Sequence, residues 1–208
     1  MTTPNDFLVQ GLENVIPAYS KFEGDMYAGL IPMDNGDRHG KTMFWLFEPK
    51  EQLVPDSIVI WLNGGPGCSS FNCGVLMEHS PVTQPLHDAG YCCLDSEPNF
   101  GYNEHTWTRA TTMLYVEHPI GTGFSFGNKY PENEEEASGD LDAFLQNFFD
   151  VFPHLAEYDF YVTGESYAGM FVPSIGRYIH RANKKALKDP DSKRKQVKLK
   201  GVALGNGE

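Results

Sequence analysis

The sequence has no long apolar run and few basic residues, and each shortage excludes a class of protein. No stretch approaches the roughly 20 apolar residues that a membrane-spanning helix needs, so no membrane span is expected. Lysine and arginine number 16 against 28 aspartates and glutamates, and the formal charge of −12 disfavours nucleic acid or an anionic membrane surface as partner. The first residues lack the charged and apolar regions of a secretory signal, so either the protein stays inside the cell or its natural N-terminus is missing.

Cysteines are also few, and they identify neither a metal site nor a redox compartment. They are Cys68, Cys73, Cys92 and Cys93, and none has zinc-ligand spacing with nearby histidines. We therefore predict no metal and no cofactor. An even count is compatible with two disulfides or with four thiols, so the compartment stays open.

Apolar runs that are typical of strands alternate with helical patterns along the chain. Strands are expected at residues 26–30, 42–47, 57–62, 112–117, 159–163 and 197–205, with a turn at 34–41 and an irregular loop at 78–105. The run 57–62 (SIVIWL) is unbroken, as in a strand buried on both faces. Two helices are expected. The first is capped by Asn133 and carries three glutamates in its first turn, and the second covers residues 167–182. This order predicts an α/β fold with a mostly parallel central sheet and flanking helices.

The stretch YVTGESYAG, residues 161–169, carries the clearest chemical signal. Its centre is Gly164-Glu165-Ser166-Tyr167-Ala168, in which Ala168 stands where the G-x-S-x-G pattern has its second glycine. A tight turn between a strand and a helix lifts a serine hydroxyl above the sheet, at the positive end of the helix. We interpret Ser166 as a nucleophile; the competing interpretation is an ordinary helix N-cap.

A glycine-rich loop strengthens the first interpretation. Asn63-Gly64-Gly65-Pro66-Gly67 follows the strand 57–62, where α/β-hydrolases place the loop that donates one oxyanion hydrogen bond. Glycines let the backbone approach a developing oxyanion, and the proline ring stiffens the loop. We assign the two oxyanion donors to the backbone N–H groups of Gly65 and Tyr167.

With these motifs the chain resembles the serine carboxypeptidase family. WLNGGPGCSS (61–70), GTGFSFG (121–127) and GESYAG (164–169) are similar to the signatures of that family, and the resemblance covers nearly the whole chain in the family's order. It implies that residues 1–208 are the N-terminal part of one α/β-hydrolase domain. It also implies a secretory, vacuolar, lysosomal or extracellular hydrolase that removes single residues from peptide and protein C-termini, usually at acidic pH.

The resemblance further implies a site for the terminal carboxylate of the substrate. Five residues match the groups that hold it: Trp61, Asn63, Gly64, Glu78 and Glu165. The segment FNCGVLME, which ends at Glu78, is one residue longer than usual, and the competing interpretation of Glu78 is a solvated helix residue. Neighbouring carboxylates resist ionising together, so a protonated glutamate would bind a peptide carboxylate best in acid.

A base for Ser166 is missing in the expected order. In this fold the triad runs Ser, Asp, His along the chain, yet Ser166 is followed only by His180 and then by Asp189 and Asp191. We interpret His118 as a structural histidine with its hydrogen bonds made, because recruiting it needs a rearranged triad. We therefore expect a truncated chain that is almost inactive alone, with the triad Asp and His beyond its C-terminal end and a free edge strand that promotes aggregation.

Two other functions stay open on the same motifs. One is an acyltransferase, in which an alcohol takes the acyl group from Ser166 in place of water. The other is a non-catalytic homologue that binds peptides through the carboxylate site. The sequence indicates no oligomeric state.

Overall fold

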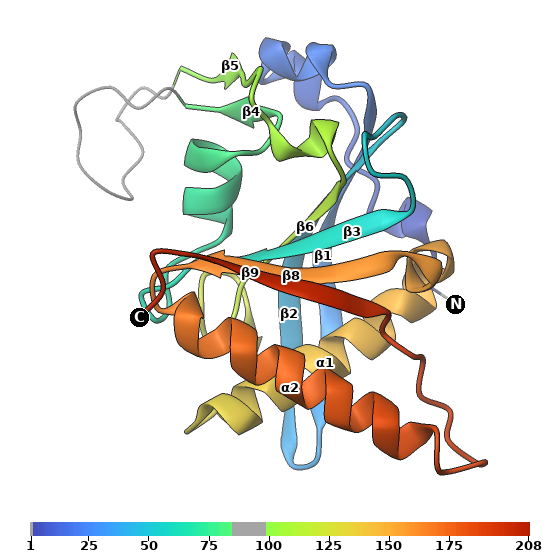
Figure 1. The fold of residues 1–208 in the computed structure, drawn as a ribbon. Helices are drawn as coiled ribbons and strands as arrows, with labels where there is room; N and C mark the ends of the chain where they lie inside the picture. The colour runs from blue at the N-terminus through green and yellow to red at the C-terminus, as the bar shows by residue number, and fades with distance from the viewer. Residues whose placement is uncertain (1, 85–98) are drawn as a thin grey trace.

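The structure is a computed structural model that describes residues 2–84 and 99–208. Its main sheet has the order β1-β2-β6-β3-β8-β9, with β7 paired to β2. These strands are β1 (Gly24–Asn35), β2 (Arg38–Pro49), β3 (Ser57–Leu62), β6 (Thr112–Val116), β7 (Phe126–Gly127), β8 (Asp159–Glu165) and β9 (Leu199–Gly205). Strands β6, β3, β8 and β9 are parallel, while β1 and β2 form an antiparallel hairpin at one side (Figure 1). The predicted α/β architecture is confirmed.

Two long helices cover one face of this sheet, α1 (Glu134–Val151) and α2 (Ala168–Ala186) (Figure 1). Asn133 caps α1, as predicted, because its side chain accepts a hydrogen bond of 3.0 Å from the backbone N–H of Glu136. Among the described residues, no helix is long and apolar enough to cross a membrane.

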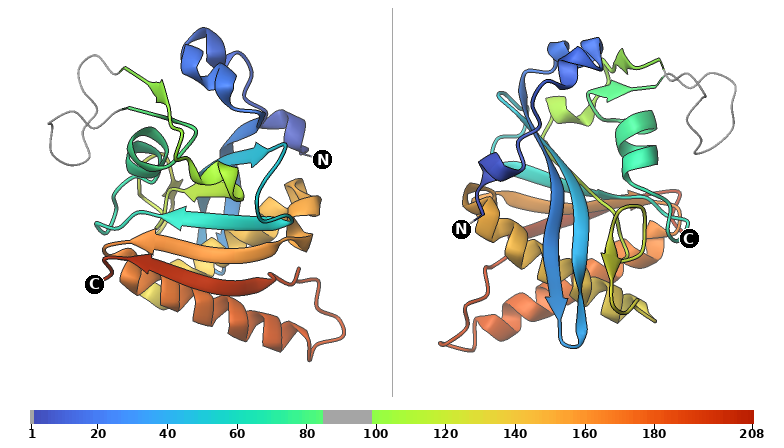
Figure 2. Two further views of the ribbon diagram at one scale, coloured as in Figure 1. Left: turned by 45° about the horizontal axis from the view of Figure 1, so that its top comes forward. Right: turned by 180° about the vertical axis from the view of Figure 1, so that it is seen from behind.

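The other face is covered by short elements (Figure 2). They comprise the helical turns Leu12–Asn14, Pro17–Lys21 and Trp107–Arg109, the helix Phe71–Glu78, and a small ribbon of β4 (Val82–Thr83) with β5 (Gly101–Tyr102). Two further turns are Pro4–Asp6, which precedes Phe7 in the core on the side of the long helices, and Pro153–Glu157, which follows α1. Alternate residues of one strand therefore enter two different cores. On β2, Phe44 and Leu46 face the long helices, while Trp45 and Phe47 pack beneath the short elements.

Three expectations about the elements need correction. The hairpin strands reach into the segment expected as a turn, so that Asn35 already pairs with Arg38, because Arg38 is buried against α1 through ion pairs. The expected loop 78–105 lies partly outside the described residues, and its described ends pair as β4 and β5. The last strand, expected over 197–205, begins at Leu199. Most of β9 is exposed to solvent, with Val202 at 51% and Leu204 at 47%.

Candidate active site

Ser166 lies in a strained turn between β8 and α2. Its φ is 55°, a left-handed conformation that is uncommon for non-glycine residues and that recurs at active sites. A Cβ at Gly164 would lie 2.6 Å from the Cβ of Ala168, so only a glycine followed by a small residue permits this close approach. Helix α2 begins at Ala168 and has no side-chain capping bond, so Ser166 is not an ordinary N-cap.

The glycine-rich loop after β3 lies directly against this turn. A Cβ at Gly64 would lie 2.6 Å from the backbone nitrogen of Tyr167 and 2.9 Å from the Cβ of Ser166. The next residue, Gly65, has a φ of 111° and is exposed at the tip of the loop. The contact arises because β3 and β8 are neighbours in the sheet, with Leu62 paired to Gly164. The structure thus brings the predicted oxyanion loop to the predicted nucleophile.

Asn63 is the centre of a hydrogen-bonded network. Its side-chain oxygen accepts a bond of 2.8 Å from the indole N–H of Trp61, and its backbone N–H donates to Ser70 Oγ at 3.1 Å. Its amide nitrogen Nδ2 donates to Glu78 Oε1 at 2.9 Å and to Glu165 Oε1 at 3.0 Å. Four of the five residues expected to hold a carboxylate therefore form one network, and Gly64 adjoins it in sequence.

The two glutamates of this network have no basic partner. Among the described residues, no lysine or arginine forms an ion pair with either of them. Burial and the charge of Glu165 raise the pKa of Glu78 to about 7, so Glu78 is protonated in acid. Since the Glu78 side chain is only 27% exposed, the interpretation as a solvated helix residue is wrong.

The helix that carries Glu78 is wound as a π-helix over Phe71–Glu78. Two of its hydrogen bonds span five residues, from Val75 N to Ser70 O at 3.0 Å and from His79 N to Gly74 O at 3.3 Å. A π-helix takes more residues per turn than an α-helix, so it accommodates the extra residue noted in FNCGVLME. Glu78 consequently still reaches Asn63.

Sequence reasoning missed two buried polar residues beside this network. His79 directly follows Glu78, and its Nδ1 lies 2.8 Å from Tyr115 Oη. Glu117, which follows β6, is fully buried, and its Oε1 accepts a bond of 2.6 Å from Ser69 Oγ. Burial raises the pKa of Glu117. The available signal was a charged residue directly after the apolar run Met113–Val116.

The histidines considered as bases do not serve Ser166 in this arrangement. Burial lowers the pKa of His118 to about 3, and its ring packs edge-on against Phe171 at 5.0 Å. The expectation that its hydrogen bonds are made is wrong, because Nε2 is buried without a partner. His180 is exposed on α2, about 21 Å along the helix from Ser166 at 1.5 Å per residue.

Among the described residues, no group of three His, Cys, Asp or Glu side chains could hold a metal ion.

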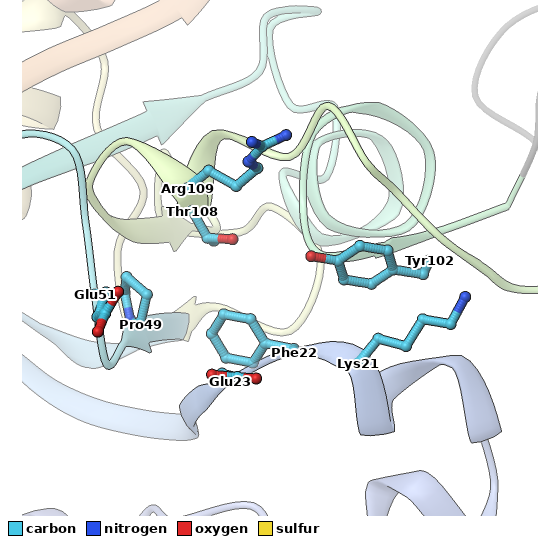
Figure 3. A pocket seen from close by; sticks show the side chains of 8 residues that line it. All are labelled: Lys21, Phe22, Glu23, Pro49, Glu51, Tyr102, Thr108 and Arg109. Atoms are coloured by element: carbon cyan, nitrogen blue, oxygen red, sulfur yellow. The ribbon is translucent and has the colours of Figure 1, made fainter.

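A separate pocket of about 250 Å³ opens beside the N-terminal turns (Figure 3). It is lined by Lys21, Phe22, Glu23, Pro49, Glu51, Tyr102, Thr108 and Arg109. The amino group of Lys21 lies 5.8 Å from the centre of the Tyr102 ring. The lining carries charges of both signs and includes none of the predicted site residues, so this pocket gives no reason to revise the site.

Comparisons with known proteins give the family. The family model of serine carboxypeptidases matches residues 17–208. Pheromone-processing carboxypeptidase kex1 of Aspergillus terreus is 38% identical over 184 residues, which cover 88% of this chain and 27% of the relative. Serine carboxypeptidase-like 35 of Arabidopsis thaliana is 35% identical over 205 residues, which cover 97% and 39%.

A solved structure shows the same fold. The crystal structure of Kex1(Δ)p, a prohormone-processing carboxypeptidase from Saccharomyces cerevisiae, matches 100% of this chain and 44% of its own, with a TM-score of 0.79 and 27% identity. The chain therefore spans less than half the length of these relatives. On the family match and the fold together, the chain belongs to the serine carboxypeptidase family.

Proposed function

We propose that this chain carries the nucleophile, the oxyanion donors and the carboxylate site of a serine-type carboxypeptidase, as the N-terminal part of one α/β-hydrolase domain. One observation carries the proposal: the amide of Asn63 binds both Glu78 and Glu165, and Glu165 directly precedes Ser166. An enzyme that removes C-terminal residues needs an anion site at a fixed, short distance from its nucleophile.

In the proposed reaction, Ser166 Oγ attacks the carbonyl carbon of the last peptide bond. The oxygen of that carbonyl becomes an oxyanion, which accepts hydrogen bonds from the backbone N–H groups of Gly65 and Tyr167. The bond to the leaving amine breaks and leaves an acyl-enzyme on Ser166, which water then hydrolyses. The base that takes the proton of Ser166, and the carboxylate that orients this base, are supplied by residues outside this chain.

The carboxylate site gives the proposed enzyme its acid preference. A peptide carboxylate beside two ionised glutamates would be repelled, whereas protonation of Glu78 removes one of the two negative charges that would face it. Because the pKa of Glu78 is about 7, binding is favoured below that pH and lost above it. This preference suits the secretory, vacuolar or lysosomal location that we infer, with peptide C-termini as substrates.

Peptide binding tests the proposal without needing the base. We expect benzoyl-glycyl-phenylalanine to bind about tenfold more tightly at pH 5 than at pH 8, the change that follows when a group of pKa about 7 must be protonated. Its C-terminal amide should bind weakly at both values. Calorimetry on wild type and on Ser166→Ala, which keeps the carboxylate site, makes the measurement. Equal affinity for acid and amide would contradict the proposal.

Two alternative functions use the same turn at Ser166, and an activity assay is needed to distinguish them. An acyltransferase would form esters where a carboxypeptidase hydrolyses blocked dipeptides. A non-catalytic homologue would bind peptides but resist a serine-directed phosphonate. Both assays belong on a polypeptide that also supplies the base, and no described contact favours either alternative.

A further inference from the structure

Two buried polar atoms beside the carboxylate site lack partners and face each other. Neither Glu78 Oε2 nor His79 Nε2 has a hydrogen-bond partner in the part of the chain that the structure describes, and the two atoms lie 3.7 Å apart. Buried polar atoms are nearly always paired, so an orphan needs an explanation. Here a small movement of Glu78 Oε2 toward His79 Nε2 would form one hydrogen bond and give both atoms a partner.

The ring of His79 is held in place on several sides. Its Nδ1 lies 2.8 Å from Tyr115 Oη. Trp107 stacks on it, with ring centres 4.2 Å apart and planes at 11°, and Trp61 meets it edge-on at 4.4 Å. The backbone oxygen of His79 also accepts bonds from Trp107 N at 3.0 Å and Thr106 Oγ1 at 2.9 Å. The ring therefore touches both Trp61 and Glu78, on two sides of the network around Asn63.

The protonation of this ring is constrained. Burial lowers the pKa of His79 to about 3, so the imidazole is neutral at physiological pH and only one nitrogen carries a proton. Among the described residues, the titratable groups that face Glu78 are Glu165, His79 and Tyr115. None of them carries a positive charge, and burial raises the pKa of the Tyr115 phenol well above its usual value.

We propose that His79 is a positioning residue of the carboxylate site, in which Nδ1–H donates to Tyr115 Oη and Nε2 accepts the proton of a neutral Glu78. The inference rests on the proposed function, because a neutral Glu78 matters only if a peptide carboxylate binds there. Asn63 donates to Oε1 of Glu78 and leaves Oε2 for this proton. The opposite tautomer would place Nε2–H toward Glu78, favour the ionised carboxylate and oppose an anionic ligand.

Two amide variants of similar size separate the two ring nitrogens. The terminal amide of His79→Gln extends to the position of Nε2, whereas that of His79→Asn extends only to the position of Nδ1. We expect Asn to lower the pH midpoint for binding benzoyl-glycyl-phenylalanine by about half to one unit, the effect of one lost hydrogen bond to the neutral acid. Gln should keep the wild-type midpoint. If both variants shift it equally, or neither does, the inference is wrong.

Nitrogen-15 NMR of the wild-type chain tests the tautomer without any substitution. We expect the proton on Nδ1 and an unprotonated Nε2 from pH 5 to pH 8; a proton on Nε2 would overturn the inference. The wild type also separates the two hypotheses. If it fails to distinguish benzoyl-glycyl-phenylalanine from its amide, the proposed function fails, whatever the spectrum shows. If it distinguishes them and the Asn variant behaves as wild type, only the role of His79 fails.

Discussion

Two buried polar clusters in this molecule differ in how their charges are paired. Near the tip of the β1–β2 hairpin, Arg38 binds Asp140 at 2.9 Å and Glu136 at 3.2 Å, and Asn35 donates a further bond of 2.8 Å to Asp140. Every charge there has an opposite charge beside it. The cluster around Asn63 instead joins two glutamates through one neutral amide and contains no cation.

The difference separates polar groups that stabilise the fold from those that we propose to bind a ligand. Among the described residues, buried side-chain atoms without hydrogen-bond partners include Glu78 Oε2, His79 Nε2, Glu117 Oε2 and His118 Nε2, which lie just after β6 or at the end of the helix Phe71–Glu78. None belongs to the Arg38 cluster. Natural proteins violate polar pairing mainly at functional sites, and the violation here coincides with the predicted one.

The largest expected effect tests the paired cluster. Arg38→Met leaves Asp140 buried with Asn35 as its one side-chain partner among the described residues. Breaking a buried ion pair in this way typically costs about 3–5 kcal/mol of unfolding free energy. Urea unfolding at pH 7 would measure it. The matched control is Arg38→Met with Asp140→Leu, which removes both charges and should recover most of the loss. A single variant as stable as wild type would show that this cluster does not stabilise the fold.

In the cluster around Asn63, we expect a substitution to increase the unfolding free energy, by a smaller amount. The folded-state pKa of Glu78 is about 7 against an ordinary 4.5, so the wild type loses stability as the pH rises between these values. Glu78→Gln cannot ionise and escapes this loss. Relative to wild type, the variant should gain about 2 kcal/mol between pH 5 and pH 8, the greater part of the linkage free energy of such a shift. Urea unfolding at both pH values measures the gain.

A control at an exposed position isolates the cause of that gain. Glu104 is exposed, so Glu104→Gln removes the same charge without relieving any burial. Its unfolding free energy relative to wild type should not change between pH 5 and pH 8. If the two variants behave alike, overall charge explains the gain, and Glu78 does not.

The smallest expected effect concerns a polar contact that only supports the fold. Asn133→Ala removes the cap of α1 and should cost about 1 kcal/mol of unfolding free energy, whereas Asn133→Asp retains an acceptor and should cost little. Neither should change the affinity for benzoyl-glycyl-phenylalanine. A change in that affinity would mean that α1 is coupled to the carboxylate site.

The sequence could predict features that depend on local backbone geometry. A serine between an apolar strand and a helix, and a glycine run after SIVIWL, fix the turn at Ser166 and the loop at Gly64 with little help from distant residues. The cap at Asn133 is local in the same sense. These features were all found where the sequence predicted them.

Features that depend on distant contacts could not be predicted in this way. His79 meets Tyr115 across 36 residues, and nothing in either segment alone indicates the contact. The sequence predicts Arg38 within a turn, because its ionic partners lie about a hundred residues away on α1. The sequence predicts that two neighbouring glutamates resist ionising together, but it does not show that burial is the main cause that raises the pKa of Glu78.

The pairing of β3 with β8 also determines when the site can form during folding. Leu62 and Gly164 are paired in the sheet. The glycine-rich loop after Leu62 and the turn at Ser166 are nevertheless separated by about a hundred residues of chain. Contacts this distant in sequence form late, because a long loop must close first. The glycine-rich loop at Gly64 and the turn at Ser166 therefore come together in one step with the central strands. A break between the two strands would remove the covalent link that makes this encounter intramolecular, even though each motif kept its own sequence.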